Sequence, residues 1–202
     1  MFVALLDTSV LWPSLQRDFL LSLHIQGAYR SIWSEAILDE LQFHEAAKLI
    51  KRDVAESEAT ARAAHLILQM RTHVADSIVL GWEPLEGTFG LPDPNDEHVV
   101  AAAVIGGAEV IVTQNLRDFP PQRLPADLEV LNAAVFARNT VDLSPRGAIA
   151  AVDEIVARSG RIGPVLTRKG VPEVLEQRHA MGDAVAAMRI TSVRRSELPT
   201  LH

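Results

Sequence analysis

The sequence predicts an α/β fold with a central, mainly parallel sheet flanked by helices. Short apolar runs alternate with longer helical segments through the first 135 residues or so. These runs are continuous and bounded by polar or proline-rich turns, a pattern that suits strands covered on both faces. At 202 residues and 48% hydrophobic content, the chain suits one domain with an extension better than two full domains.

Three apolar runs are the predicted strands. They are residues 2–7 (FVALLD), 110–113 (VIVT) and 128–131 (LEVL). The first ends in an acid, Asp7, and polar residues also follow the second. Open α/β folds gather their chemistry at the carboxyl edge of the sheet, so the residues that follow these strands are candidates for a functional site.

A helix is predicted near residues 34–44. Ser34 is suited to cap it, Glu35 lies favourably in its first turn, and an apolar stripe follows. The stripe consists of Ile37, Leu38 and Leu41. A longer helical region, rich in alanine and charged residues, is expected over residues 46–75 with a break near Ser57.

Residues 91–113 read as a helix, a short turn and a strand. Asp93 can cap the helix, Pro94 occupies a favoured first helical position, and Gly106–Gly107 ends the helix before the strand. Asp96 then falls in the first turn, where an acid complements the helix dipole. His98 is two residues further on, and its spacing points it away from Asp96, so we assign it a structural role.

Composition limits the chemistry and the compartment. The chain contains no cysteine, so a metal ion would have to be bound by oxygen or imidazole ligands, and no disulfide ties the protein to an oxidising environment. The segment after Met1 lacks a basic region and is too short for a signal peptide or a membrane span. We therefore expect a cytoplasmic protein with no membrane partner.

Charge is distributed unevenly along the chain. Residues 1–140 hold 10 Lys/Arg against 19 Asp/Glu, net −9, whereas residues 141–202 hold 9 against 7, net +2. An acidic body argues against broad, non-specific affinity for nucleic acid. It leaves a nucleic-acid substrate open, because divalent cations can neutralise several carboxylates locally.

Each candidate acid has a structural explanation as well as a functional one. Asp7 is either a cap for the next segment or a site residue, since an unpaired acid is costly at the end of a buried strand. Glu40 alone reads as a solvated helix residue, and capping alone explains Asp96. Asn115 and Asp118 suit either a turn or a metal site. Alternating strands and helices can bring these acids to one end of the sheet, which independent capping has no reason to do.

Taken together, four motifs resemble the PIN-domain nucleases, particularly the VapC-type toxins of bacterial toxin–antitoxin pairs. The motifs are LLDTSV, WSEAILDEL, DPNDEHVVAAAV and VTQNLRDFP, and their order and spacing agree over about residues 2–135. The resemblance implies a PIN-like nuclease domain over residues 1–138, and the composition of residues 139–202 predicts a helical extension packed on it. It implies metal-binding acids at Asp7, Glu40, Asp96 and Asp118, supporting polar groups at Asn115 and Thr113, and an extra acid at Asp93.

The resemblance also implies an activity. It is the hydrolysis of RNA phosphodiester bonds by a Mg²⁺- or Mn²⁺-dependent endoribonuclease, with an RNA substrate, an antitoxin protein and a second copy of the chain as expected partners. A catalytically inactive PIN scaffold that serves as a binding module is one alternative. An Asp-based phosphotransfer domain is another, but it requires a lysine near a later strand end, and Lys48, Lys51 and Lys169 are not so placed.

The C-terminal segment is expected to be helical. Residues 147–159 and 172–190 are amphipathic, and the second segment carries apolar residues near helical spacing, which predicts their burial. These are Val174, Leu175, Ala180, Met181, Ala184, Val185 and Met188. Because this segment is net positive, we hypothesise that some of its basic residues contact RNA phosphates, where an antitoxin segment could compete. They are Arg158, Arg161, Arg168 and Lys169.

Overall fold

The computed structural model describes residues 1–161 and 164–196, which fall into two compact units. The sheet unit consists of residues 2–13 and 30–131, and the helical unit of Met1, residues 14–29 and residues from 132 onward. The two units interleave in sequence, because residues 14–29 group with the C-terminal helices. The division predicted at residue 138 stays a prediction, and residues 162–163 and 197–202 of its extension lie outside the described residues.

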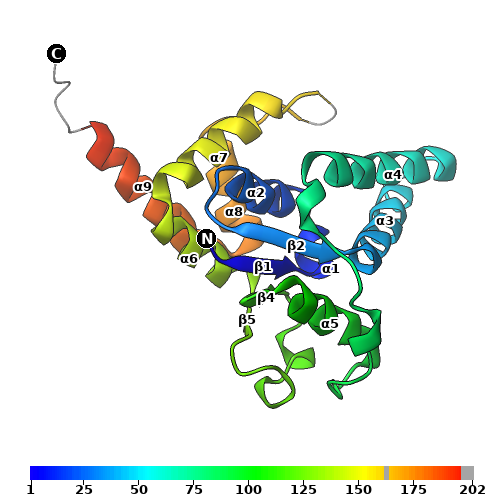
Figure 1. Ribbon diagram of the computed structural model, residues 1–202. Helices are drawn as coiled ribbons and strands as arrows, with labels where there is room; N and C mark the ends of the chain where they lie inside the picture. The colour runs from blue at the N-terminus through cyan, green and yellow to red at the C-terminus, as the bar shows by residue number, and fades with distance from the viewer. Residues whose placement is uncertain (162–163, 197–202) are drawn as a thin grey trace. The chain divides into compact units, whose positions relative to one another are not determined.

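The sheet unit contains a five-stranded parallel sheet in the order β3-β2-β1-β4-β5. Figure 1 labels β2, β1, β4 and β5 of this sheet. Its strands are β1 (Val3–Leu6), β2 (Arg30–Ser34), β3 (Ile78–Val79), β4 (Val110–Val112) and β5 (Glu129–Leu131). Central β1 pairs Leu5 with Ile32 of β2 and with Ile111 of β4, and all three side chains are buried. The predicted α/β fold with a mainly parallel sheet flanked by helices is thus confirmed.

Two of the strands were not predicted. In β2 only Ile32 and Trp33 are large and apolar, and they lie between serines, so the segment lacks a continuous apolar run. Strand β3 is two residues long, too short to give a periodic signal. Both strands form because they pair with a neighbour that is already part of the sheet.

Helices and short 3₁₀ turns connect these strands. The helices are α1 (Thr8–Leu11), α3 (Glu35–Ile50), α4 (Glu56–His73) and α5 (Glu97–Gly106). The 3₁₀ turns are η1 (Ala75–Ser77), η2 (Glu83–Leu85), η3 (Pro94–Asp96), η4 (Leu116–Asp118) and η5 (Pro121–Arg123).

The helix predicted near residues 34–44 is longer than expected. Ser34 caps α3 as predicted, its hydroxyl accepting a hydrogen bond from the Ile37 N–H at 3.3 Å. The helix then continues to Ile50, and the chain turns over residues 51–55, where Asp53 adopts a positive φ of 61°. The break between the two helices therefore lies before Ser57. Helices α3 and α4 pack on each other as a hairpin and are joined by an ion pair between Glu35 and Arg71.

Helix α5 begins and ends close to the predicted signals. Asp93 caps the single turn η3 rather than α5 itself, and α5 ends at Gly106, with Gly107 in the left-handed conformation at φ 65°. A Cβ atom on Gly106 would lie 2.3 Å from Cδ1 of Ile32 and 2.8 Å from Cγ2 of Val79. Glycine at this position therefore lets the helix approach β2 and β3 closely.

The helical unit consists of α2 (Ser14–Ile25), α6 (Ala133–Leu143), α7 (Pro145–Arg158), α8 (Gly170–His179) and α9 (Gly182–Ser196). Gln26 donates a hydrogen bond to Glu154 at 2.6 Å, and Arg158 donates one to Ser22 at 2.8 Å, which ties α2 and the residue after it to α7. Among residues 1–161 and 164–196, no helix is long and apolar enough to cross a membrane.

The tail is helical as predicted, but residues 172–190 do not form one helix. The chain breaks at Ala180, which adopts a left-handed φ of 54° and is exposed, contrary to its predicted burial. Val174 is half-buried. The predicted burial is confirmed for Leu175, Met181, Ala184, Val185 and Met188.

Candidate functional site

The site is built around Asp7, where β1 ends at the carboxyl edge of the sheet. The Asp7 side chain is 6% exposed, and its Oδ2 accepts hydrogen bonds from the Ser9 hydroxyl at 2.6 Å and the Thr113 hydroxyl at 2.7 Å. Thr113 directly follows β4, the strand next to β1. Since both hydroxyl groups donate to the same oxygen, they hold the carboxylate in one orientation.

The same two hydroxyl groups hold the loop that carries Asp118. Ser9 Oγ accepts from the Gln114 N–H at 2.9 Å, and Thr113 Oγ1 accepts from the Asn115 N–H at 3.0 Å. The Asp118 N–H then donates to the Asn115 carbonyl at 3.0 Å, which closes the turn η4. Asn115 and Asp118 thus form a turn, and hydrogen bonds to Ser9 and Thr113 hold the start of this turn at the carboxyl edge of the sheet.

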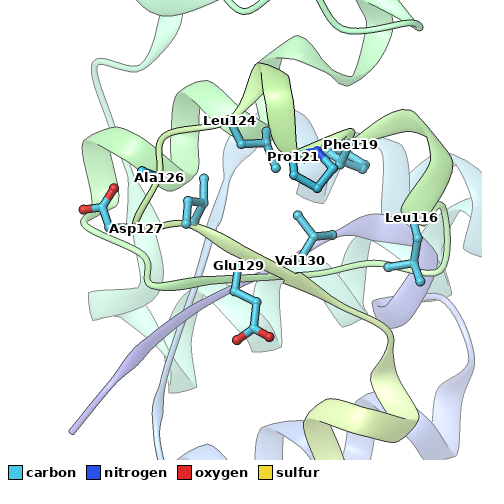
Figure 2. A pocket seen from close by; sticks show the side chains of 9 residues that line it. Leu116, Phe119, Pro121, Leu124, Ala126, Asp127, Glu129 and Val130 are labelled. Atoms are coloured by element: carbon cyan, nitrogen blue, oxygen red, sulfur yellow. The ribbon is translucent and has the colours of Figure 1, made fainter.

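The far end of this loop is anchored by apolar packing. Phe119, directly after Asp118, is 1% exposed, and Figure 2 shows it together with Pro121 and Leu124 above Val130 of β5. These side chains line a pocket of about 500 Å³. With hydrogen bonds at one end and a buried ring at the other, Asp118 has a defined position rather than that of a free turn residue.

Glu40 on α3 contacts two side chains from other elements. Its Oε2 accepts a hydrogen bond from the Thr8 hydroxyl at 2.6 Å, and its Oε1 lies 3.1 Å from His98 Nε2. Burial alone would raise the pKa of Glu40, but the hydrogen bonds from His98 and Thr8 outweigh it and lower the pKa below its ordinary value. The 44% exposed side chain is therefore an ionised carboxylate that has partners and remains accessible to solvent.

His98 belongs to this cluster, although its sequence position suggested a purely structural role. Its side chain is 7% exposed, and its ring lies 5.9 Å from the Trp82 ring. Burial opposes protonation, but the hydrogen bond and charge of Glu40, with smaller effects of Asp7 and Glu86, raise the pKa of His98 above its ordinary value. Helical spacing around His98 could not predict this contact, because its partner Glu40 lies on α3 and not on the helix of His98.

The pKa of Asp96 is changed by burial and by the charges of neighbouring acids. Burial, followed by repulsion from the carboxylates of Asp7, Asp118 and Asp93, raises the pKa of Asp96 to about 6 from its usual 3.8. Asp93 itself accepts hydrogen bonds from the Asn95 backbone N–H at 2.9 Å and its side-chain amide at 3.0 Å, so it acts as a cap. These charges act on Asp96 from Asp7, which follows β1, from Asp118 of η4 and from Asp93, the cap of η3.

Glu97 is a buried acid that the sequence analysis did not single out. It is 2% exposed and accepts hydrogen bonds from the Leu91 N–H at 2.7 Å and the Phe89 N–H at 3.0 Å. Burial would raise the pKa of Glu97, but these backbone bonds lower it. Glu97 therefore anchors the loop that leads to Asp93. The available signal was an acid at the start of the continuous apolar run of α5.

The oxygen atoms of these side chains are of the kind that binds a hard divalent cation. Carboxylate, hydroxyl and amide oxygens are the ligands that Mg²⁺ and Mn²⁺ prefer, and the repulsion at Asp96 is relieved by a positive charge. Within the described residues, no group of three or more His, Cys, Asp or Glu side chains lies close enough to hold one ion. The Glu40 carboxylate is bonded to Thr8 and His98.

The basic residues predicted to contact RNA lie in the helical unit. Arg168 forms an ion pair with Asp153 at 2.8 Å, Lys169 lies 3.6 Å from Glu173, and Arg161 is exposed. The predicted role of these three residues in RNA binding stays a prediction.

In open α/β folds ligands bind at the carboxyl edge of the sheet, which is where Asp7 and Thr113 lie. A family model described as PIN domain matches residues 3–117, and the chain belongs to this family. The match includes Asp7, Glu40, Asp96 and Thr113, and it indicates a nuclease-type function. No curated protein and no solved structure matches the chain.

Proposed function

We propose that the protein is a divalent-metal-dependent endoribonuclease that hydrolyses RNA phosphodiester bonds. The observation that carries this proposal is the position of Asp7 at the carboxyl edge of the sheet, where Ser9 and Thr113 bind both its carboxylate and the loop that leads to Asp118. A cluster with this much negative charge would repel a phosphate, so it requires a cation to bind one. Membership of the PIN domain family supports nuclease chemistry at this place.

The resemblance to PIN-domain nucleases assigns the Mg²⁺ or Mn²⁺ ion to Asp7, Glu40, Asp96 and Asp118, whose carboxylates would have to move closer together to share it. When bound, such an ion neutralises charge on the carboxylates and the phosphate and lowers the pKa of water, which supplies the nucleophile. The protein's own contribution is to hold the carboxylates in place. Ser9 and Thr113 orient Asp7 through hydrogen bonds to Oδ2.

Glu40 is oriented in the same way by two donors. Thr8 and His98 bind its two oxygens separately, which fixes the plane of the carboxylate. The amide of Asn115, in the loop that carries Asp118, would orient a water molecule or a neighbouring carboxylate. Attack of water on phosphorus with cleavage of the P–O3′ bond leaves a 5′-phosphate and a 3′-hydroxyl, the displaced oxygen taking up a proton.

The proposal extends to the biological setting. The four sequence motifs resemble VapC-type toxins, and on that basis the protein would be the toxin of a toxin–antitoxin pair. Its partners would then be RNA and an antitoxin protein, with a homodimer as its own assembly.

The test is cleavage of end-labelled RNA by the purified chain with Mg²⁺, with Mn²⁺ and with EDTA. Asp7→Asn and Asp96→Asn should abolish cleavage while the protein remains folded, and Glu40→Gln should be nearly as damaging. Glu35→Gln is the matched control, because Glu35 lies on the same helix but pairs with Arg71. Cleavage that persists in EDTA or in Asp96→Asn would refute the proposal. Absent cleavage by the wild-type chain would favour an inactive binding module.

A further inference from the structure

Strand β5 lies at one end of the sheet and pairs with β4 alone among the described strands. The Glu129 N–H donates to the Glu109 carbonyl at 2.9 Å, toward β4. The Leu131 carbonyl accepts from the Thr113 N–H at 3.0 Å, on the same side. Since alternate residues of a parallel strand direct their backbone groups to opposite sides, the N–H and C=O of Val130 point away from β4. An unpaired edge of this kind can pair with a strand of another chain.

Val130 also lines the pocket of about 500 Å³ beside β5. The buried ring of Phe119 and the exposed side chain of Leu116 form part of its wall. In Figure 2 the Val130 side chain points toward Pro121, whereas the Glu129 side chain points away from it. A strand added at the open edge would therefore place every second side chain on the face of the sheet that carries the pocket.

The residues that lead into β5 are acidic. Asp127 and Glu129 are exposed, and neither carboxylate forms a hydrogen bond or ion pair within the described part of the chain. The pocket lining includes these two acids and no basic residue. The open edge thus offers an apolar pocket on the face of Val130 and a negative charge on the face of Glu129. A strand with apolar side chains on one face and basic side chains on the other is complementary to both.

Other occupants match this edge less well. If two copies of β5 paired antiparallel about Val130, each Glu129 would face Leu131 of the other copy. The two Glu129 residues would then be diagonal neighbours, roughly 7–8 Å apart on one face, and their charges would repel. An RNA strand would be repelled by the same acids. A small apolar molecule could fill the pocket but would leave the backbone groups of Val130 without a partner.

We propose that the open edge of β5 binds an extended segment of another protein in which apolar and basic side chains alternate. The main chain of this segment pairs with Val130, and an apolar side chain enters the pocket beside Phe119. Basic side chains on the opposite face meet Glu129, and Asp127 adds negative charge before the strand begins. The inference is independent of the proposed function, because it uses none of the proposed metal ligands.

The test is the binding of labelled peptides to the full chain, measured by fluorescence anisotropy. The probe is a peptide of about seven residues, an ordinary strand length, in which lysine and valine alternate. The control peptide has the same composition with its lysines and valines in two separate blocks, so its charge is equal but its faces are mixed. The protein variant is Glu129→Lys. Glu83→Lys is the matched control, because it makes the same change in net charge at an exposed position of η2.

The wild-type chain should bind the alternating peptide about tenfold more tightly than the block peptide, because only the former presents valine to the pocket and lysine to Glu129 together. Glu129→Lys should weaken binding of the alternating peptide about fivefold, since an opposite-charge pair becomes a like-charge pair. Glu83→Lys should leave it within about twofold of wild type. Equal affinity for the two peptides would overturn the inference, as would equal losses in the two variants.

Amide hydrogen exchange shows whether the peptide pairs with the strand. The Val130 N–H should exchange at least about tenfold more slowly with the alternating peptide bound, because it then donates to the peptide main chain. The Glu129 N–H, already bonded to Glu109, should change much less. Peptide binding with unchanged exchange at Val130 would place the peptide elsewhere and overturn the inference. Self-association of the free chain that protects the Val130 N–H would assign the edge to a second copy, and it too would overturn the inference.

Discussion

Replacing the buried Glu97 carboxylate by glutamine should destabilise the sheet unit without altering the chemical groups of the acidic site. Glu97 is 2% exposed and accepts from the Leu91 N–H at 2.7 Å and the Phe89 N–H at 3.0 Å. Glutamine has the same shape but keeps only one acceptor, and its NH₂ group would face a backbone N–H. One charge-assisted hydrogen bond is lost and the other is weakened.

The expected loss follows from these two bonds. A hydrogen bond to a charged group contributes about 1.5–3 kcal/mol, and a buried donor without a partner costs about 1–3 kcal/mol. Allowing for partial relaxation of the loop, we expect Glu97→Gln to lower the free energy of unfolding by about 3 kcal/mol. The exposed Glu83 is the matched position, and Glu83→Gln should stay within about 0.5 kcal/mol of wild type.

Urea unfolding of the metal-free protein measures this difference, and its dependence on pH tests the cause. The backbone hydrogen bonds lower the pKa of Glu97 below its ordinary 4.5. The carboxylate therefore stabilises the fold fully above pH 4.5, and this contribution is lost as the pH falls through the lower, folded-state pKa. The gap between wild type and Glu97→Gln should shrink in acid. A variant as stable as wild type at pH 7, or a gap that widens in acid, would refute the reasoning.

Three further outcomes are expected. Asp96→Asn should stabilise the metal-free protein at pH 7.5. The pKa of Asp96 is raised to about 6, so its ionisation lowers the stability of the fold as the pH rises from 3.8 through 6. After solvent screening the expected gain in the free energy of unfolding is about 1 kcal/mol, and urea unfolding that shows no gain would contradict it. Mg²⁺ should raise the melting temperature of wild type and have much less effect on Asp7→Asn, as measured by thermal unfolding with and without the ion; equal shifts would show that Asp7 does not hold the ion. Gly106→Ala should cost about 1–3 kcal/mol in urea unfolding, because its Cβ would lie 2.3 Å from Cδ1 of Ile32; a neutral effect would mean that α5 is not held against β2 as closely as described.

The elements that were predicted correctly are those whose signal is local. Strands β1 and β4 are continuous apolar runs, α3 has Ser34 as its cap, and α5 ends at Gly106, before Gly107 in the left-handed conformation. In each case a few neighbouring residues specify the conformation, because capping bonds, positive φ and apolar runs act over short distances. The order of four such motifs was also enough to indicate the PIN domain family, which the family model shows.

Elements without a local signal were missed or misplaced. Strand β3 forms because β2 lies beside it, and α3 continues to Ile50, past the point where the next helical region was expected to begin. Residues 172–190 keep a helical composition throughout, yet the chain breaks at Ala180. Here the energy that decides the conformation comes from packing partners, which composition does not reveal.

By itself, the sequence determined the fold class, the family and the acids that belong to its motifs. Only the tertiary structure decided how these acids interact. It places His98 against Glu40 across 58 positions, makes Glu97 a loop anchor, and lets the charges of Asp7 and Asp118 raise the pKa of Asp96. The physical reason is that electrostatic and hydrogen-bond energies depend on distance in space, and residues far apart in the chain become close only when the sheet and its helices assemble.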